Sequence, residues 1–473
     1  MASHNLLVLS DVHLGSDLVN HVQPGAPRQA SSDRRDQELA GLFDWYREHR
    51  QEARPWRLVI AGDFVDFVGM SISMPSSGLG TEPDEDDVTN GLGSAEDHTI
   101  YKLRCVAQRH GSVFDSLARF VADGNTLVIV RGNHDVDFHW PAVQEEFVRQ
   151  LESHASFARG AVEFAPWFYY EEGRVFVEHG HQYDRYCSYE HLLHPVSPRD
   201  PRRSSRSLSD ILLRHVVRPT RGLLETGHES AGPLDYVVFA ARLGVLGMLM
   251  LANRFARAVA MLFRIWRDHS SDAARRIGEH HERRMEELAR SLDLRIDSLR
   301  ELSSLQRPPV TRSFAALAAT VMLDRVLLAL VGTVTVVAAV CFASRWHALG
   351  VAGGVFVVVP AVSLLLSFAR RDIEPSRELR ERAAYVARLF PAAFVVMGHT
   401  HLPEVRPTGG AASTYVNLGA WADGGGDESA LGTKTHLVVH ERDDGRPIAE
   451  LLVWDGATGP RRFLSAVDPA PIS

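Results

Sequence analysis

The sequence is poor in cysteine, with Cys105, Cys187 and Cys341 far apart along 473 residues. Three thiols at these spacings indicate neither a disulfide framework nor a thiolate metal site. The lack of disulfides favours a reducing compartment, so we expect the bulk of the chain in the cytoplasm. Residues 1–10 also lack a basic region followed by a long apolar one, and we therefore expect no secretory signal.

The chain also lacks an excess of positive charge. Its 51 basic and 59 acidic residues give a formal net charge of −8 at pH 7. This balance provides no general electrostatic footprint for nucleic acid, and we expect no nucleic-acid partner. An apolar fraction of 45% and a charged fraction of 23% are typical of a globular protein, and the length allows two or three domains.

Three consecutive apolar runs predict buried strands of a parallel sheet, at residues 5–10, 57–61 and 126–131. Leucine, valine and isoleucine follow one another in these runs, as in a strand that is covered on both faces. Helical patterns over residues 34–50 and 98–122 connect the runs. The order of strand, helix and strand indicates an α/β fold.

Polar residues follow each of these strands where the chain turns. After the second strand, Gly62 allows a sharp turn that directs Asp63 into the crevice where open α/β sheets hold their ligands. Similar polar groups follow two further expected strands, at residues 175–178 and 391–397. The five groups are Asp11-x-His13, Asp63-x-x-Asp66, Asn133-His134-Asp135, His179 and His399-x-His401.

In this order, the five groups resemble the motifs of the calcineurin-like metallophosphoesterase superfamily. They lie within residues 5–184 and 393–418, so the resemblance covers under half of the chain. It implies an α/β fold, a four-layer αββα sandwich, and hydrolysis of a phosphate ester with the help of metal ions. The strands that would complete the sheets are expected at residues 162–164, 168–171, 414–418, 435–440 and 448–454.

Imidazole, carboxylate and amide oxygen form a mixed nitrogen and oxygen donor set that suits manganese, iron or zinc. The resemblance implies two divalent ions, and we expect manganese, with iron and zinc as alternatives. Two such ions lower the pKa of a shared water, so that a metal-bound hydroxide attacks the phosphorus. In the family's pattern, Asp11, His13 and His401 would hold one ion, Asn133, His179 and His399 the other, and Asp63 would bridge them.

Two further residues resemble catalytic residues of the family that do not bind metal. His134 matches the histidine beside the metals, and Asp66 matches its carboxylate partner, which would fix the ring tautomer and favour the imidazolium. For Asp135 and Glu178, local hydrogen bonding is the simpler interpretation. His181 is expected beside the ligands rather than among them, because the family's ligand is usually the first residue of a His-Gly-x turn.

Residues 191–385 lie outside the motifs and are expected to form a helical insertion. Within it, an amphipathic helix over residues 234–266 suits an anionic membrane surface, with packing against another domain as the alternative. Residues 270–305 predict one helix or a short helical hairpin. Before the insertion, the acidic stretch at residues 75–97 predicts a mobile surface loop whose acids are solvated.

Two strongly apolar runs, residues 326–343 and 349–369, are each long enough as a helix to cross the hydrocarbon core of a membrane. They predict a transmembrane hairpin with two spans. Arginines flank the hairpin on the side of both large parts of the chain, which predicts a catalytic domain on the cytoplasmic side of the inner membrane. That domain would consist of residues 1–190 and 386–473.

These features predict a dinuclear-metal phosphoesterase at the membrane surface, acting on a phosphoester substrate that is lipid-linked or membrane-proximal. A second hypothesis is a membrane-tethered nucleotide or phosphoprotein phosphatase. A third is a non-catalytic membrane scaffold that retains the fold, although a scaffold has no need of imidazoles and carboxylates at the motif positions.

Overall fold

The strands form two mixed sheets in a computed structural model that describes residues 4–19, 30–75, 77–220, 242, 244–369, 374–409, 412–421, 434–456 and 458–463. One sheet has seven strands in the order β12-β11-β10-β1-β2-β3-β4, and the other has five in the order β5-β6-β7-β9-β8. The first comprises β1 (Asn5–Leu9), β2 (Trp56–Ala61), β3 (Thr126–Val130), β4 (Val162–Ala165), β10 (Thr435–Glu441), β11 (Pro447–Asp455) and β12 (Gly459–Arg462). The second comprises β5 (Phe168–Glu171), β6 (Val175–Glu178), β7 (Phe394–Met397), β8 (Glu404–Pro407) and β9 (Thr414–Asn417).

The two sheets share one buried apolar cluster. Leu6, Val8 and Val59 of the seven-stranded sheet belong to the same cluster as Val177 and Val396 of the five-stranded sheet. Neighbouring residues of these strands point to the opposite face, where they meet helices. The central strands are therefore covered on both sides, which is the physical reason for their uninterrupted apolar sequence.

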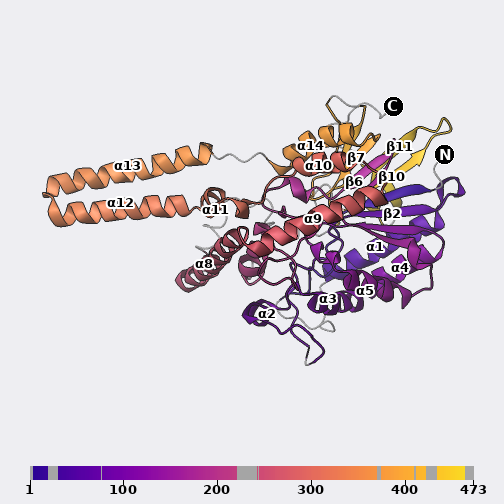
Figure 1. Ribbon diagram of the computed structural model, residues 1–473, viewed down its shortest axis with the longest axis horizontal. Coiled ribbons are helices and arrows are strands. Elements are labelled where there is room, and N and C mark those ends of the chain that lie inside the picture. Colours follow the sequence, from indigo (N-terminus) through magenta and orange to yellow (C-terminus); the bar gives the residue numbers. More distant parts are fainter. Residues whose placement is uncertain are drawn as a thin grey trace.

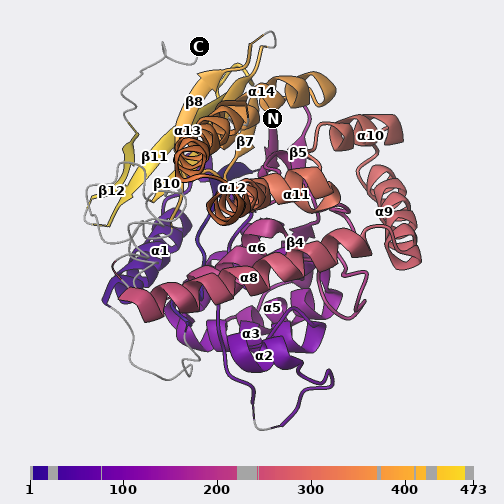
Figure 2. The same cartoon turned by 90° about the vertical axis from the view of Figure 1, so that its left-hand side faces the viewer.

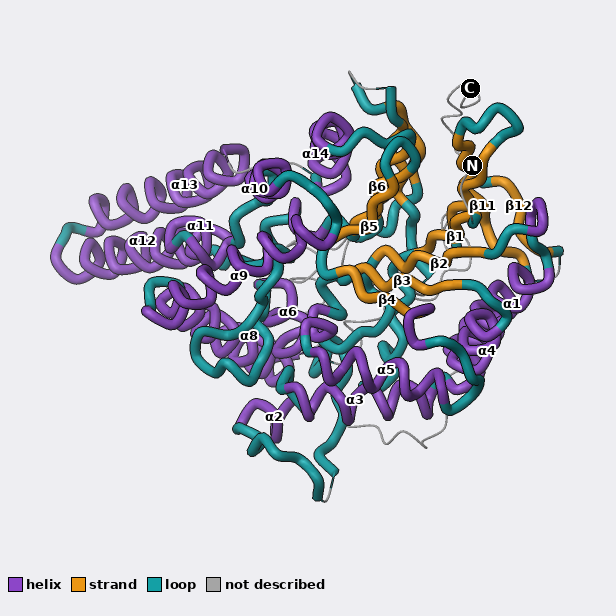
Figure 3. Tube along the Cα trace, turned by 45° about the vertical axis from the view of Figure 1, so that its right-hand side comes forward, coloured by secondary structure: helices purple, strands orange, loops and turns teal. Residues whose placement is uncertain are grey.

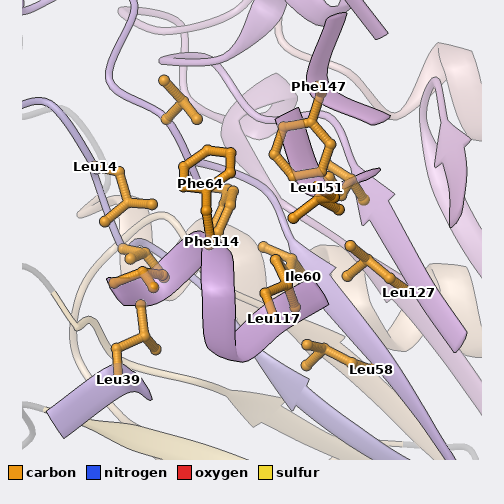
Figure 4. Close-up of a cluster of buried hydrophobic side chains, with 14 of the residues drawn as sticks. Leu14, Leu39, Leu58, Ile60, Phe64, Phe114, Leu117, Leu127, Phe147 and Leu151 are labelled. Carbon is orange, nitrogen blue, oxygen red and sulfur yellow. The ribbon is translucent and has the colours of Figure 1, made fainter. Parts of the chain in front are cut away.

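Helices α1 (Ala30–Glu48), α3 (Glu96–Arg109), α4 (Gly111–Ala122) and α5 (Pro141–Glu152) cover the outer face of the seven-stranded sheet (Figure 3). Figure 4 shows Leu58, Ile60 and Leu127 of the strands beside Phe114 and Leu117 of α4. Burial of this kind stabilises a fold by roughly 25 cal/mol for each Å² of apolar surface removed from water. This cluster fixes the strands from which the polar residues emerge.

The outer face of the five-stranded sheet is covered by α14 (Pro375–Leu389), α9 (Asp272–Ser291) and α10 (Ile296–Ser304). Leu379 and Val386 of α14 share a buried cluster with Val395 of β7 and with Leu299 and Leu302 of α10. The insertion therefore contributes helices to the body of the protein. The sequence predicted either one helix or a short helical hairpin here. Residues 272–304 form two helices, as in the hairpin.

Parallel pairing brings the carboxyl ends of the central strands to the same level. Leu9 of β1 lies opposite Ile60 of β2, and Ala61 of β2 lies opposite Val130 of β3. In the other sheet, β6 and β7 are also parallel. The polar residues that follow these strands therefore emerge along neighbouring edges of the two sheets, where ligands are held in α/β folds.

In the described part of the insertion, the remaining helices are α6 (Leu208–Leu212), the π-helical η5 (Leu213–Val217), α8 (Gly244–Asp268), the short η8 (Val310–Arg312), α11 (Phe314–Thr320), α12 (Leu323–Phe342) and α13 (Arg345–Ala369). Figure 1 shows α12 and α13 projecting from the body as an antiparallel pair, and Figure 2 views this pair end-on. Both helices expose many large apolar side chains. By length and composition, α8, α12 and most of α13 could each cross a membrane. The sequence predicted two spans, and the structure adds α8 as a third candidate.

The second half of α8 also packs against the protein. Its Ala258 and Leu262 are buried against Ile211 of α6, Val216 of η5 and Leu317 of α11. These three partners belong to the insertion, so this half of the helix packs within the insertion itself. Of the stretch expected to precede it, residues 234–241 and 243 lie outside the described residues, as do the flanking residues 370–373.

Two expectations about local structure were wrong. Residues 98–122 form two helices, because the chain turns at His110, whose ring bonds to Asp36 and to the Gly15 amide. Within residues 75–97, which were expected to form a mobile loop, residues 85–90 form helix α2 (Glu85–Asn90). Its capping box and the pairing of the buried Asp87 with Arg203 at 2.6 Å stabilise this helix. Strands β8 and β12 were not anticipated from the sequence.

Candidate metal centre

Several predicted ligands have a left-handed backbone. The φ angles are 54° at Asp11, 52° at His13, 54° at Asp63, 68° at His399 and 57° at His401. Non-glycine residues rarely adopt positive φ, and those that do concentrate at functional sites because the conformation costs free energy. The sharp turns after β1, β2 and β7 direct these side chains toward a common point.

Asp11, His13 and His401 form the first group, with ligand atoms that all lie within 4.8 Å of one another. The Nε2 atom of His401 lies 3.1 Å from Asp11 Oδ1, and the Nε2 atom of His13 lies 3.9 Å from the same oxygen. His13 Nε2 is buried and has no hydrogen-bond partner among the described residues. A buried polar atom without a partner is costly, so this nitrogen fits a role as metal ligand.

Asp63 lies between the first group and a second. One of its carboxylate oxygens, Oδ2, is 3.8 Å from His13 Nε2 and 3.2 Å from His179 Nε2. The same nitrogen of His179 is 3.1 Å from Asn133 Oδ1. Because His179 Nδ1 lies 2.8 Å from the Ala61 carbonyl, it donates its hydrogen there and leaves Nε2 to bind a cation.

His399 stands next to this second group. Its ring lies 5.4 Å from that of His179, and its backbone N–H donates to Asp11 Oδ2 at 3.1 Å. Its Nε2 is 3.2 Å from Asp184 Oδ2, a carboxylate that the sequence did not single out. A carboxylate on one ring nitrogen of a ligating histidine fixes the orientation of the ring, which is the position that Asp184 holds.

The charged groups at this centre shift one another's pKa values. Burial lowers the pKa of His179, but Asp63 and Asp11 outweigh this effect and raise it to about 9. Burial raises the pKa of Asp63, but His179 and His134 outweigh this effect and hold it well below its ordinary value. For His13, burial and the neighbouring His134 lower the pKa to about 4. Asp63 and His13 thus have the protonation states that a divalent cation requires of its ligands, whereas His179 would release a proton on binding one.

His134 and Asp66 form a hydrogen-bonded pair beside the centre. His134 Nδ1 lies 2.7 Å from Asp66 Oδ1, and the ring contacts His13 edge-on with 4.5 Å between centroids. Burial lowers the pKa of His134, but Asp66 and Asp63 outweigh it and raise the pKa to about 10. The raised pKa favours the imidazolium form of His134, which can donate a proton.

Asp66 has a second cationic partner that the sequence did not reveal. Arg218, at the end of η5 in the insertion, donates from Nη2 to Asp66 Oδ2 at 2.8 Å and from Nη1 to the Ser16 carbonyl at 3.1 Å. Tyr189 is a second residue near the site that the sequence did not reveal. Its hydroxyl donates to the Asn133 carbonyl at 3.1 Å. Neither belongs to a motif, so only the folded chain brings them to the site.

The residues expected to act through local hydrogen bonds do make such bonds. Asp135 accepts from the backbone N–H groups of Gly132 at 2.6 Å and Phe64 at 2.8 Å. Glu178 accepts from the Tyr183 hydroxyl at 2.7 Å. His181 is buried beside His179, with 5.4 Å between ring centroids, and neither of its ring nitrogens has a hydrogen bond within the described part of the chain.

Comparison with known proteins gives one family. A family model described as calcineurin-like phosphoesterase matches residues 4–240. A search of curated proteins finds no match. The matched region contains the first four of the five polar groups, and the fifth, which contains His399 and His401, follows the insertion.

Proposed function

Because the chain belongs to the calcineurin-like phosphoesterase family, and is thus a metal-dependent phosphoric ester hydrolase, we propose that it acts through a dinuclear centre at a membrane surface. The observation that carries the dinuclear assignment is the position of Asp63. Its Oδ2 faces His13 at 3.8 Å on one side and His179 at 3.2 Å on the other. A single carboxylate between two sets of nitrogen and oxygen ligands is suited to bridge two cations.

In this proposal each ion has its own ligands. One ion is held by Asp11, His13 and His401, the other by Asn133, His179 and His399, and Asp63 is shared. When bound, two divalent ions would supply an activated water and neutralise charge on the phosphoryl group. The donor set contains no thiolate, which favours manganese over softer metals, with iron and zinc as alternatives.

The remaining chemistry belongs to His134 and Asp66. His134 donates a proton to the leaving oxygen, because its Nδ1 is held by Asp66 and its other ring nitrogen remains as the donor. Asp66 sets the tautomer and keeps the imidazolium charged. Arg218 acts as a positioning residue, since it neutralises and orients Asp66 from the opposite side. Through Arg218 the insertion takes part in shaping the site.

We assign residues 1–190 and 386–473 to a four-layer αββα catalytic domain and residues 191–385 to the insertion. The layers are the two sheets and the helices on their outer faces. Helices α12 and α13 form a hairpin of two spans in the cytoplasmic membrane, with the catalytic domain in the cytoplasm. Their exposed apolar surfaces support this assignment, because apolar patches of that size need a partner or a membrane.

The presence of these apolar helices in the same chain favours a lipid-linked or membrane-proximal phosphoester, and a nucleotide or phosphoprotein is the second candidate. Hydrolysis of an aryl phosphate monoester and an aryl phosphate diester by the full-length protein tests the activity. We expect turnover that requires manganese and is lost in Asp63→Asn. Hydrolysis that persists in Asp63→Asn, or after metal is removed, would contradict the proposed centre.

A further inference from the structure

A large cleft lies between α8 and helix α2 of the catalytic body. It encloses about 960 Å³ and is walled by α2, residues 189–206, α6, η5, α8 and the beginning of α9. None of the proposed metal ligands lines it. Tyr189 forms part of its wall and contacts the backbone of Asn133, so the cleft and the metal centre share one side chain but are distinct compartments.

Eight arginines and six acids line this cleft, and several of the arginines are neutralised by neighbouring acids. Arg203 pairs with Asp87 at 2.6 Å, and Arg214 pairs with Asp86 at 2.9 Å. Further pairs join Arg199 to Asp268, Arg275 to Asp272 and Arg312 to Glu190. These arginines hold the walls together and leave little positive charge to attract a ligand.

Three other arginines of the cleft have no carboxylate closer than 3.6 Å in the described part of the chain. Arg206 has its nearest carboxylate, that of Asp137, at 3.6 Å, and its Nη1 is buried without a hydrogen bond among the described residues. Arg257 and Arg264 of α8 have no ion pair within the described part of the chain, and both line the cleft. They are two helical turns apart, so their Cα atoms are separated by about 10 Å on one face of α8. Guanidinium groups in this arrangement are suited to bind a phosphate.

The same cleft has an apolar side. Met261 and Ile265 of α8 line it beside Arg257 and Arg264. Toward its N-terminal end, α8 leaves the body, and its Val245, Leu246 and Leu249 side chains are 71%, 73% and 63% exposed. Figures 1 and 2 show this helix next to α11, close to the base of the projecting α12–α13 pair. A ligand that has both an anionic group and an apolar part would match this combination.

We propose that the cleft is a second binding site of this protein, which takes a phosphate-bearing ligand between α8 and the catalytic body. Arg257 and Arg264 contact the phosphate from α8, and Arg206 contacts it from the opposite wall. The ligand is the headgroup of an anionic lipid or a free phosphate compound, which present the same chemistry to the arginines. This site does not depend on the metal centre, and it contributes no residue to hydrolysis.

Calorimetric binding to metal-stripped, full-length protein in neutral detergent tests the proposal. The probes are dihexanoyl phosphatidic acid, inorganic pyrophosphate and, as a zwitterionic control, dihexanoyl phosphatidylcholine. Stripping the metals removes any binding of the anion to metal ions. We expect at least one anionic probe to bind, and expect Arg257→Gln combined with Arg264→Gln to weaken its binding by about tenfold or more, because each lost bond to a charged group contributes to affinity.

Arg267→Gln is the matched control, because Arg267 is exposed on the same helix and does not line the cleft. Binding of phosphatidic acid alone identifies a lipid headgroup as the ligand, and equal binding of pyrophosphate identifies a free phosphate compound. The proposal is wrong if neither anion binds, if phosphatidylcholine binds as tightly as phosphatidic acid, or if the double variant binds like Arg267→Gln. These results leave the hydrolytic proposal untouched, since no metal is present.

Discussion

Arg218→Ala removes one hydrogen-bonded contact between the catalytic body and the insertion. Arg218 Nη2 lies 2.8 Å from the Oδ2 atom of Asp66, a side chain that is 1% exposed. After the substitution, Asp66 keeps His134 Nδ1 at 2.7 Å and the Gly69 amide at 2.7 Å as partners of its Oδ1 atom. Its Oδ2 atom loses the bond that faces the insertion.

The size of the effect follows from the kind of bond. A hydrogen bond to a charged group contributes about 1.5–3 kcal/mol. Because Asp66 orients His134, loss of this bond leaves the proton donor poorly oriented. Loss of an outer partner of a catalytic site typically lowers activity by about 10- to 100-fold. We therefore expect kcat to fall in that range while KM and the bound metal change little, because Arg218 contacts none of the proposed ligands.

The assay is steady-state hydrolysis of an aryl phosphate, with the metal content of each variant measured in parallel. Arg218→Lys keeps the charge and should recover part of the lost turnover. Arg254→Ala is the matched control, since Arg254 bonds to Thr220 in the same region and does not reach Asp66. An unchanged kcat in Arg218→Ala, or an equal loss in Arg254→Ala, would refute the role assigned to this contact.

Three further outcomes are expected. Asp66→Asn should retain both metals and slow turnover, as measured by metal analysis and kcat, because Asp66 contacts His134 rather than the ions; loss of both metals would show that the roles are divided wrongly. Burial lowers the pKa of Lys102 to about 7 from 10.5, so between these pH values the unfolded chain holds a proton that the folded chain lacks, and stability rises with pH. The melting temperature of the wild type should therefore rise relative to Lys102→Met from pH 7 to 10, and a constant difference would contradict this. A carbonate wash should leave the protein in the membrane fraction, and its release without detergent would contradict the assignment of α12 and α13 as spans.

The strands and the polar groups at their ends could be predicted because one physical cause produces both signals. A strand covered on two faces is apolar throughout, as in residues 57–61, and its end is the first point at which a charged side chain can reach solvent or a ligand. Asp63 marks such a point after β2. The family match then agrees with what these local patterns indicated.

The contacts made by the insertion could not be predicted in the same way. Arg218 is 152 residues from Asp66 along the chain, and no periodicity or motif links the two. The sequence predicted that the acidic residues 84–87 are solvated. In the structure, however, Asp87 is buried and pairs with Arg203, which is 116 residues away along the chain. Pairing over such distances depends on how the insertion folds back onto the body, which local sequence does not encode.

The central claim is that Asp63 joins two metal ions, and electron paramagnetic resonance of the manganese-loaded protein tests it most directly. We predict two manganese ions per chain in the wild type, with the spectrum of an exchange-coupled pair. In Asp63→Asn, which keeps the size of the side chain but removes its charge, the coupled spectrum should disappear together with hydrolysis. An Asp63→Asn protein that still holds two coupled ions, or a wild type that binds only one, would contradict the account.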